Sequence, residues 1–382
     1  MINKNVIALG FVSFFTDMAS SMVTTILPIY IVYILNEGVD KLGYIIAITT
    51  FVSYSFRILF GYLSDRYKIV KPFIVSGYAI SALTKPLLYY ATSWGTIGAL
   101  RGVERIGKAI RSASKDSLIS NYSEKNSSGK TFGFHKSMDI AGELVGATLV
   151  FLIFYYIGKD VEVFKNIFAL SFIPGVLSVF IVLFFVKDAP YKDIKERAFD
   201  IKTDYKILPT LFIYFGAIFF VFDTSFYIVK AKEVGYGIEY IPLLVILLNF
   251  VQTLSSYYFG LKVDKFGSSR ILLLSFVFGL ISLISLYFNF IIISFIFLAL
   301  FLVSSINSLR SYISVNATNK ATVYGVLYGG IALSSALGAI VFGLIWQYFG
   351  ESTALVVSMS GISVICIFTT VLIVTRANRD KS

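Results

Sequence analysis

One charged stretch occurs twice in this chain. Residues 61–71 read GYLSDRYKIVK, and residues 260–270 read GLKVDKFGSSR. The two copies match at a constant offset of 199 residues (260 − 61 and 264 − 65) in a glycine, an acid and a base: Gly61, Asp65 and Arg66, then Gly260, Asp264 and Lys265. Each copy separates two apolar blocks, so we expect a tight basic gating loop at equivalent places in two halves. An internal repeat of this kind constrains the architecture before any helix is counted.

The apolar blocks on either side of these stretches run for about 20 residues, the length that a helix needs to cross a bilayer. The chain is 57% hydrophobic and 14% charged, whereas soluble domains carry about 25% charged residues. The blocks are continuously apolar and do not alternate in polarity, which favours spanning helices over a barrel. These features predict an all-α integral membrane protein.

Window hydropathy predicts twelve spans. The first half contains residues 6–35, 42–63, 72–91, 94–111, 132–157 and 163–186. The second half contains residues 207–229, 241–261, 271–288, 290–311, 324–348 and 352–375. We therefore expect an N-terminal six-helix bundle over residues 1–186, a charged cytoplasmic linker over 187–206, and a C-terminal six-helix bundle over 207–382.

The net charge of +11 does not indicate a nucleic-acid partner, because the bases lie in short loops between apolar blocks. Most of them fall on one side of the predicted topology, the positive-inside pattern. This pattern predicts a multi-pass protein of the cell membrane with both termini in the cytoplasm. Nothing in the pattern favours an obligate oligomer, so we expect a monomer.

The sequence lacks the residues that several kinds of site require. Cys366 is the only cysteine and His135 the only histidine, so we expect no internal disulfide, no zinc site and no cofactor. A phosphate-binding loop of the GxxxxGK[ST] type is missing, which argues against ATP as the energy source. No pairing of a nucleophile with a base is visible, so we do not expect an enzyme.

A second repeat supports the first. Gly133, Gly146 and Ala147 match Gly325, Gly338 and Ala339 at an offset of 192 residues (325 − 133). Small residues on one helix face let two backbones approach closely in lipid. We therefore expect tight helix packing at both places.

Together these features resemble the major facilitator superfamily. The repeated stretch is similar to that family's signature between spans two and three and between spans eight and nine, although the first copy has Lys68 where the second keeps Gly267. Gly133, Gly142 and Gly146 resemble the family's antiporter signature, with Ala147 in place of its proline. The resemblance implies two pseudosymmetric six-helix bundles around a cavity lined by spans one, four, seven and ten.

The predicted fourth span carries an unusual stripe of charge. Its members recur at spacings of three and four, which places them on one helix face: Arg101, Glu104, Arg105, Lys108, Arg111 and Lys115. An unpaired charge at membrane depth costs at least about 2.5–3.5 kcal/mol, so the stripe should face polar groups or water. Arg101 with Glu104 also resembles the family's fourth-span arginine signature. We interpret Lys108, Arg111 and Lys115, together with Arg57 and Lys85, as bases that snorkel to the interface.

The fifth span offers counterions for this stripe. His135, Asp139 and Glu143 lie four residues apart on one face. Because spans four and five are antiparallel neighbours, we predict that Arg105 pairs with Asp139 and that Arg101 pairs with Glu143. We interpret His135 as a residue of the interfacial helix start, with a proton relay as the alternative.

Two further acids lie inside spans that are structural equivalents in the two halves, Asp17 in the first and Asp223 in the seventh. The resemblance places both on the cavity, where they could oppose one another and could load and release a proton. The candidate solute and ion site is therefore the set Asp17, Arg101, Glu104, Arg105, Asp139, Glu143 and Asp223.

The sequence thus predicts a secondary active transporter that moves a small solute by alternating access, coupled to protons as symporter or antiporter. Arginine binds carboxylate and phosphate bidentately, which favours an anionic or zwitterionic solute. The acids leave open a proton-driven exporter of drugs, cations or a divalent metal. A non-transporting membrane sensor or a lipid scramblase is the alternative of another class.

Overall fold

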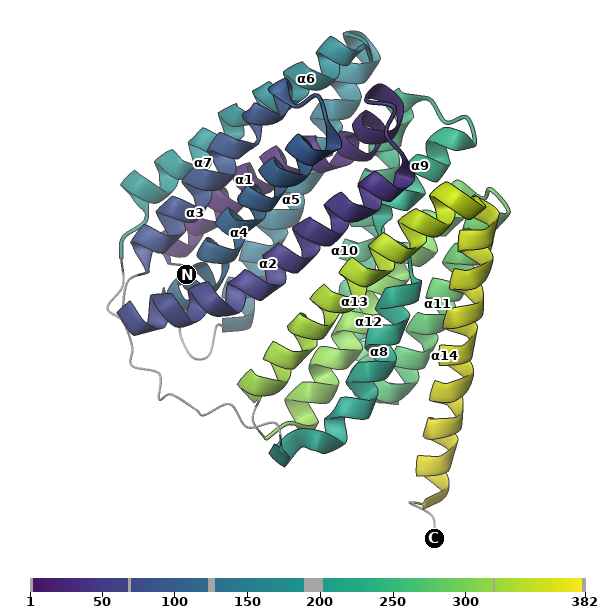
Figure 1. The fold of residues 1–382 in the computed structure, drawn as a ribbon. Coiled ribbons are helices and arrows are strands. Elements are labelled where there is room, and N and C mark those ends of the chain that lie inside the picture. The colour runs from purple at the N-terminus through teal and green to yellow at the C-terminus, as the bar shows by residue number, and fades with distance from the viewer. Residues whose placement is uncertain (1–2, 68–69, 123–127, 189–201, 319, 380–382) are drawn as a thin grey trace. The chain divides into compact units, whose positions relative to one another are not determined.

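The structure is a computed structural model that describes residues 3–67, 70–122, 128–188, 202–318 and 320–379. The described chain is helical and contains no strand (Figure 1). It divides into two compact units. Unit 1 comprises Met1–Glu37, Ile48–Glu196 and Gly237–Ile246, and unit 2 comprises Gly38–Ala47, Arg197–Tyr236 and Leu247–Ser382.

The helices of the first half begin with α1, which continues directly into a short π-helix, η1. The bounds are α1 Lys4–Ile29, η1 Tyr30–Ile34, α2 Val39–Tyr67, α3 Lys71–Thr84, η2 Pro86–Tyr90, α4 Trp94–Tyr122, α5 Ser128–Tyr156, α6 Val161–Leu170 and α7 Phe172–Phe185. The predicted third span is the pair α3 and η2, broken before Pro86. The predicted sixth span is the pair α6 and α7.

The second half repeats this plan with its first span broken in two. Its bounds are η3 Lys202–Ile207, α8 Leu208–Phe220, α9 Thr224–Glu233, η4 Ile238–Tyr240, α10 Ile241–Phe266, α11 Ser268–Tyr287, α12 Ile291–Asn316, α13 Lys320–Phe349 and α14 Glu351–Arg379. Within the part of the chain that the structure describes, nine segments are long and apolar enough to cross a membrane. The protein is therefore a multi-pass, all-α membrane protein.

The two units follow the two predicted halves with one exchange. Residues 38–47, at the start of α2, belong to unit 2, and residues 237–246, at the start of α10, belong to unit 1. The division at 186 and 207 stays a prediction, and most of the predicted linker, residues 189–201, lies outside the described residues.

The repeated charged stretch is mostly helix, so its interpretation as a loop is wrong in extent. The first copy continues α2 to Tyr67, and the second continues α10 to Phe266. The second copy turns at Gly267, whose φ of 84° suits glycine because that residue has no Cβ. Gly260, Asp264 and Lys265 occupy the last turns of α10, where the two charged side chains are exposed. Gly61, Asp65 and Arg66 lie in the last turns of α2, and their side chains fall outside the described residues.

Helices α1 and α5 pack backbone to backbone in unit 1. A Cβ added at Gly142 would lie 2.2 Å from the carbonyl oxygen of Phe14, and one added at Gly146 would lie 2.4 Å from that of Met18. In unit 2 a Cβ at Gly338 would lie 2.5 Å from the carbonyl oxygen of Phe219, on α8. The predicted close packing at the second repeat is therefore confirmed at Gly146 and Gly338, and it is wrong at Gly133 and Gly325, where an added Cβ would meet no atom within 4 Å.

This packing predicts that Gly142→Ala destabilises the protein although alanine favours helix formation. The added methyl has to displace the α1 backbone, and overpacking of this kind costs about 1–3 kcal/mol. Thermal unfolding of the purified protein in detergent measures the change. Gly133→Ala on the same helix is the matched control, because its Cβ would meet no atom within 4 Å. Equal melting temperatures for the two variants would contradict the packing.

Candidate functional site

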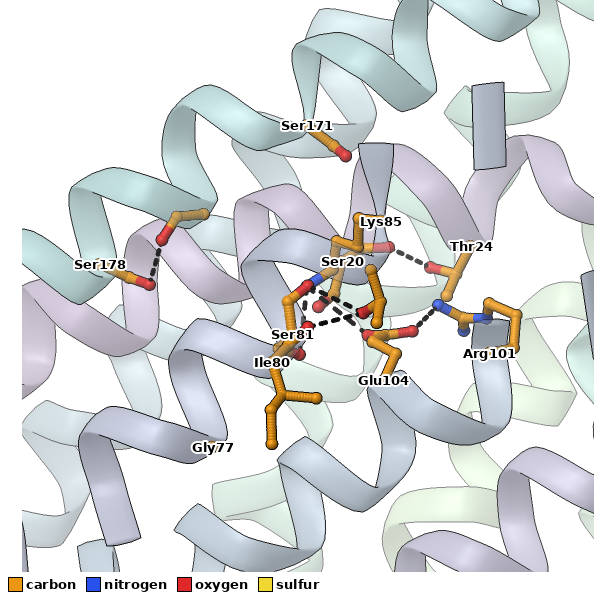
Figure 2. A network of polar contacts seen from close by, with 12 residues as sticks. Ser20, Thr24, Gly77, Ile80, Ser81, Lys85, Arg101, Glu104, Ser171 and Ser178 are labelled. Atoms are coloured by element: carbon orange, nitrogen blue, oxygen red, sulfur yellow. Dashed lines mark hydrogen bonds and ion pairs between the residues drawn. The ribbon is translucent and has the colours of Figure 1, made fainter. Parts of the chain in front are cut away.

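Three buried charges of unit 1 form one network where α3 packs against α4. The Glu104 carboxylate lies between the Lys85 ammonium and the Arg101 guanidinium (Figure 2). Only 1% of Lys85, 3% of Arg101 and 2% of Glu104 is exposed. None of the three can therefore reach the membrane surface, and their charges have to be balanced locally.

The contacts show how this balance is made. Lys85 Nζ lies 3.5 Å from Glu104 Oε1, and Arg101 Nη1 donates to Glu104 Oε2. Lys85 Nζ also donates to the carbonyl oxygen of Ser81 at 3.3 Å and to Ser81 Oγ at 3.4 Å. Arg101 Nε is buried and has no hydrogen-bond partner among the described residues. One acid thus serves two bases, which leaves this network with one net positive charge.

The position of Lys85 follows from the end of α3. Proline cannot donate a backbone hydrogen bond and disfavours the α conformation in the residue before it. Here α3 ends at Thr84, and Pro86 opens the 3₁₀ turn η2. Lys85 stands at this junction and its side chain turns inward to Glu104 (Figure 2). The prediction that Lys85 snorkels is wrong.

The predicted pairs between α4 and α5 are not formed. Arg101 pairs with Glu104 on its own helix, three residues away, and not with Glu143. Arg105 has no ion pair within 4.0 Å among the described residues, so its predicted pairing with Asp139 is also wrong. Its Nε atom is buried without a hydrogen-bond partner in the described part of the chain.

Arg111 and Lys115, the last two bases of the α4 stripe, are also more buried than predicted. Arg111 is 5% exposed, lies 4.5 Å from the centre of the Tyr78 ring and donates to the carbonyl oxygen of Gly77 at 3.5 Å. Lys115 donates to Ser13 Oγ at 3.1 Å. The prediction that these two bases snorkel is therefore wrong, because a cation–π contact and a hydroxyl hold them inside unit 1.

Lys108 and Arg57, the other two bases that were predicted to snorkel, have different surroundings. The side chain of Lys108 is exposed and forms no ion pair within 4.0 Å of a described residue. Arg57 pairs with Asp116, with Nη2 2.7 Å from Oδ2. Both members of that pair are more than one third exposed, so it contributes little stability.

Helices α1 and α5 add a second polar cluster to unit 1. His135 Nε2 lies 2.9 Å from Ser13 Oγ, and His135 Nδ1 lies 3.4 Å from Asp139 Oδ1. Lys136 Nζ lies 3.9 Å from the other oxygen of Asp139. The predicted spacing of four along α5 thus places His135 against Asp139, and the structure adds Ser13 from α1.

Two bases and two acids of this region form neither an ion pair within 4.0 Å nor a side-chain hydrogen bond with a described residue: Arg105, Lys108, Asp17 and Glu143. They are nevertheless electrostatically coupled. Lys108 interacts with Arg105, with Asp17 and with Glu143, and Glu143 interacts with Asp17. Unit 1 thus gathers two bases and two acids around α1, α4 and α5 whose side chains have neither an ion pair nor a hydrogen bond among the described residues, whereas Arg111 and Lys115 are held by neutral groups.

The seventh predicted span is broken where its acid stands. Helix α8 ends at Phe220 and α9 begins at Thr224, and Asp223 is the N-cap of α9. Asp223 Oδ1 accepts a hydrogen bond from the backbone N–H of Ser225 at 2.8 Å, which is a capping interaction. Asp223 is half-buried, so this acid has a structural task in unit 2. Its predicted relation to Asp17 stays a prediction.

Sequence reasoning named Lys85, Ser13 and Lys115 but missed their contacts with Glu104 and His135 and with each other. The sequence did contain a signal for Lys85. A lysine directly before a proline stands where the helix ends, so its side chain does not have to follow the face of that helix. Ser13 lies four residues before Asp17 and thus on the same face of α1. The sequence contained no signal for the contact between Lys115 and Ser13.

Comparison with known proteins agrees with this architecture. The sequence profile of the Major Facilitator Superfamily matches residues 9–304. An uncharacterised MFS-type transporter of Methanocaldococcus jannaschii is 32% identical over 371 residues, covering 93% of this chain and 91% of the relative. An uncharacterised protein of Mycobacterium tuberculosis is 22% identical over 82% of this chain and 80% of its own length. The chain belongs to the Major Facilitator Superfamily.

Solved structures share the fold at low sequence identity. The crystal structure of the nucleoside transporter NupG has a TM-score of 0.80 at 13% identity, covering 97% of this chain and 99% of that chain. A bacterial homologue of the human lysosomal transporter Spinster, inward-facing and occupied, has a TM-score of 0.74 at 16% identity, covering 96% and 95%. These likenesses confirm the predicted fold class, and both neighbours are described as transporters.

The buried network predicts that Glu104→Gln destabilises the protein. The substitution keeps the shape of the side chain but leaves Lys85 and Arg101 without a counterion, and breaking a buried pair in this way costs about 3–5 kcal/mol. Thermal or denaturant unfolding in detergent measures the loss. Glu162→Gln is the control, since Glu162 accepts a hydrogen bond from Tyr89 at an exposed site and should change stability by less than about 0.5 kcal/mol. A stable Glu104→Gln protein would show that the network is not charged.

Proposed function

We propose that the chain is a secondary active transporter of the cell membrane that moves a small anionic or zwitterionic solute by alternating access, coupled to protons. Membership of a family of transporters supports the class. Arg105, Lys108, Asp17 and Glu143 of unit 1 support the choice of solute and of coupling ion.

The free-energy cost of unpaired charges points to the class of solute. A charge inside a membrane protein that lacks a partner is expensive, and such residues commonly mark a solute or ion path. Glu104 is already shared by Lys85 and Arg101, so it cannot neutralise Arg105. The Arg105 guanidinium and the Lys108 ammonium are therefore available to an anionic group, and guanidinium binds carboxylate or phosphate in two parallel hydrogen bonds.

The acids extend this argument to a zwitterion. Asp17 on α1 and Glu143 on α5 are the unpaired carboxyl groups that interact with Lys108. A solute with an ammonium and a carboxylate would satisfy both signs at once, whereas a purely anionic solute would leave the acids to another cation. A proton is the simplest such cation, because it removes the repulsion between Asp17 and Glu143.

A second candidate function rests on the same acids. Two unpaired carboxyl groups also suit a cationic drug or metal ion that is exported in exchange for protons. Among the described residues, no group of three or more His, Cys, Asp and Glu side chains could hold a metal ion. Uptake assays separate these cases from a sensor, which would move no solute, and from a scramblase, which would move lipid.

The test is uptake into proteoliposomes that contain the purified protein. Radiolabelled amino acids and dipeptides, monocarboxylates, neutral nucleosides and cationic dyes are supplied with and without a pH gradient. We expect accumulation of a zwitterion or an anion that a pH gradient drives and a protonophore abolishes. Accumulation of cationic dyes alone would favour the exporter, and lipid movement without solute flux would overturn the proposal.

Variants of the two unpaired bases sharpen the test. Arg105→Met and Lys108→Met each remove a charge-assisted hydrogen bond worth about 1.5–3 kcal/mol. We therefore expect the KM for the transported solute to rise by roughly 10–100-fold. Lys165→Met is the control, because Lys165 lies on α6 over the ring of Tyr89 and forms no ion pair with a residue of the proposed site. Unchanged KM values in both α4 variants would exclude these bases from solute binding.

A further inference from the structure

A continuous chain of polar side chains joins three helices of unit 1. It begins at Lys115 on α4, whose Nζ donates to Ser13 Oγ on α1 at 3.1 Å. Ser13 Oγ lies 2.9 Å from His135 Nε2 on α5. On the other side of the ring, Nδ1 lies 3.4 Å from Asp139 Oδ1. The proposed solute site uses neither Ser13 nor Lys115.

Charge fixes the direction of these hydrogen bonds. The Lys115 ammonium has no lone pair, so Ser13 Oγ accepts from it. The one hydroxyl proton of Ser13 is then free to point at His135 Nε2, which accepts it. The neutral ring consequently carries its proton on Nδ1, on the side of the Asp139 carboxylate, whose Oδ1 lies 3.4 Å away without forming a hydrogen bond. Two hydrogen bonds thus link Lys115, Ser13 and His135, and the Asp139 carboxylate is the next polar group in line.

The two central members of the chain are buried. Ser13 is 1% exposed and His135 is 6% exposed. The same two helices, α1 and α5, touch backbone to backbone at Gly142, one turn beyond Asp139. Asp139 Oδ1 is buried and has no hydrogen-bond partner within the described residues. A buried acceptor left open beside an imidazole needs an explanation, and a proton that arrives from the ring supplies one.

We propose that Ser13 and His135 form a proton relay between Lys115 and Asp139. In one transfer Lys115 Nζ gives a proton to Ser13 Oγ, and Ser13 gives its own hydroxyl proton to His135 Nε2. The Nδ1–H bond of His135 then breaks, and that proton passes to Asp139 Oδ1. One proton has moved: the Lys115 ammonium becomes an amine, the Asp139 carboxylate becomes a carboxylic acid, and the ring ends neutral in its other tautomer. The reverse sequence resets the chain.

Two further acids lie next to the relay and could receive the proton from it. Glu143 lies one turn beyond Asp139 on α5, and Asp17 lies one turn beyond Ser13 on α1, so both unpaired acids follow the relay on the faces that carry it. Lys136 faces the second oxygen of Asp139 at 3.9 Å. The inference rests on the proton coupling of the proposed function and assigns its route.

The single histidine of the chain makes the relay directly observable. We would label the full-length protein with ¹⁵N-histidine, place it in lipid nanodiscs and record the ring N–H signal of His135 by NMR. The probe is exchange of that ring proton with deuterium from water. A neutral imidazole holds its remaining proton tightly, so the Nδ1 proton can leave only after Nε2 has received one through Ser13. No solute is added.

We expect rapid exchange in the native protein and, in Ser13→Ala, exchange slower by at least about tenfold, since a positioned proton donor contributes about 10²–10⁴-fold to proton transfer. Ser13→Thr keeps the hydroxyl and should exchange like the native protein. Ser137→Ala, on α5 but outside the chain, is the matched control and should do the same. Thermal unfolding of each variant confirms that it is folded.

Slow exchange in the native protein would overturn the relay, and so would native exchange in Ser13→Ala or slow exchange in Ser13→Thr. Lys115→Met provides a second variant, in which exchange should also slow because Ser13 loses its donor; native exchange there would remove Lys115 from the path. Because these measurements need no solute, a failed relay is distinguishable from failed proton coupling, which the uptake assays report separately.

Discussion

The balance of buried charge around Glu104 organises the candidate site. In a membrane protein each enclosed ion needs a partner, since water is not at hand to solvate it. Glu104 supplies that partner to Lys85 from the end of α3 and to Arg101 on its own helix. Because this one acid serves two bases, the next base of the α4 stripe, Arg105, is left without a counterion. The availability of charge for a solute thus follows from how Glu104 is shared.

Backbone packing decides which groups face one another across α1 and α5. Glycine at 142 and 146 lets the two helices touch, and their polar residues then meet at fixed positions along the contact. Unit 2 repeats the packing through Gly338 against Phe219, but it does not repeat the chemistry. There the corresponding acid, Asp223, caps α9 across a break in its span. The two halves share an architecture, whereas the dense cluster of ionisable groups described above belongs to unit 1.

Much of the fold could be predicted from the sequence, because helices in lipid need long apolar runs and the repeats tie the two halves together. The sequence identified most charged members of the candidate site, but it did not reveal their pairing or the parts that Lys85 and Ser13 have in it. The spacing of three between Arg101 and Glu104 was visible, yet the rotation of α4 that turns both toward Lys85 is set by packing against α3, where Gly77 and Gly107 meet. Asp223 was placed in a continuous span, because an apolar sequence does not reveal where a helix breaks and needs a cap.

The measurement that tests this account most directly is a double-mutant cycle between Lys85 and Glu104. Unfolding free energies would be compared for the native protein, Lys85→Met, Glu104→Gln and the double variant. If Glu104 neutralises Lys85 in a water-excluded setting, the two changes should be non-additive by at least about 2 kcal/mol, with the double variant more stable than Glu104→Gln alone. Strictly additive losses would contradict the account, because they would show that the two side chains do not share a charge balance.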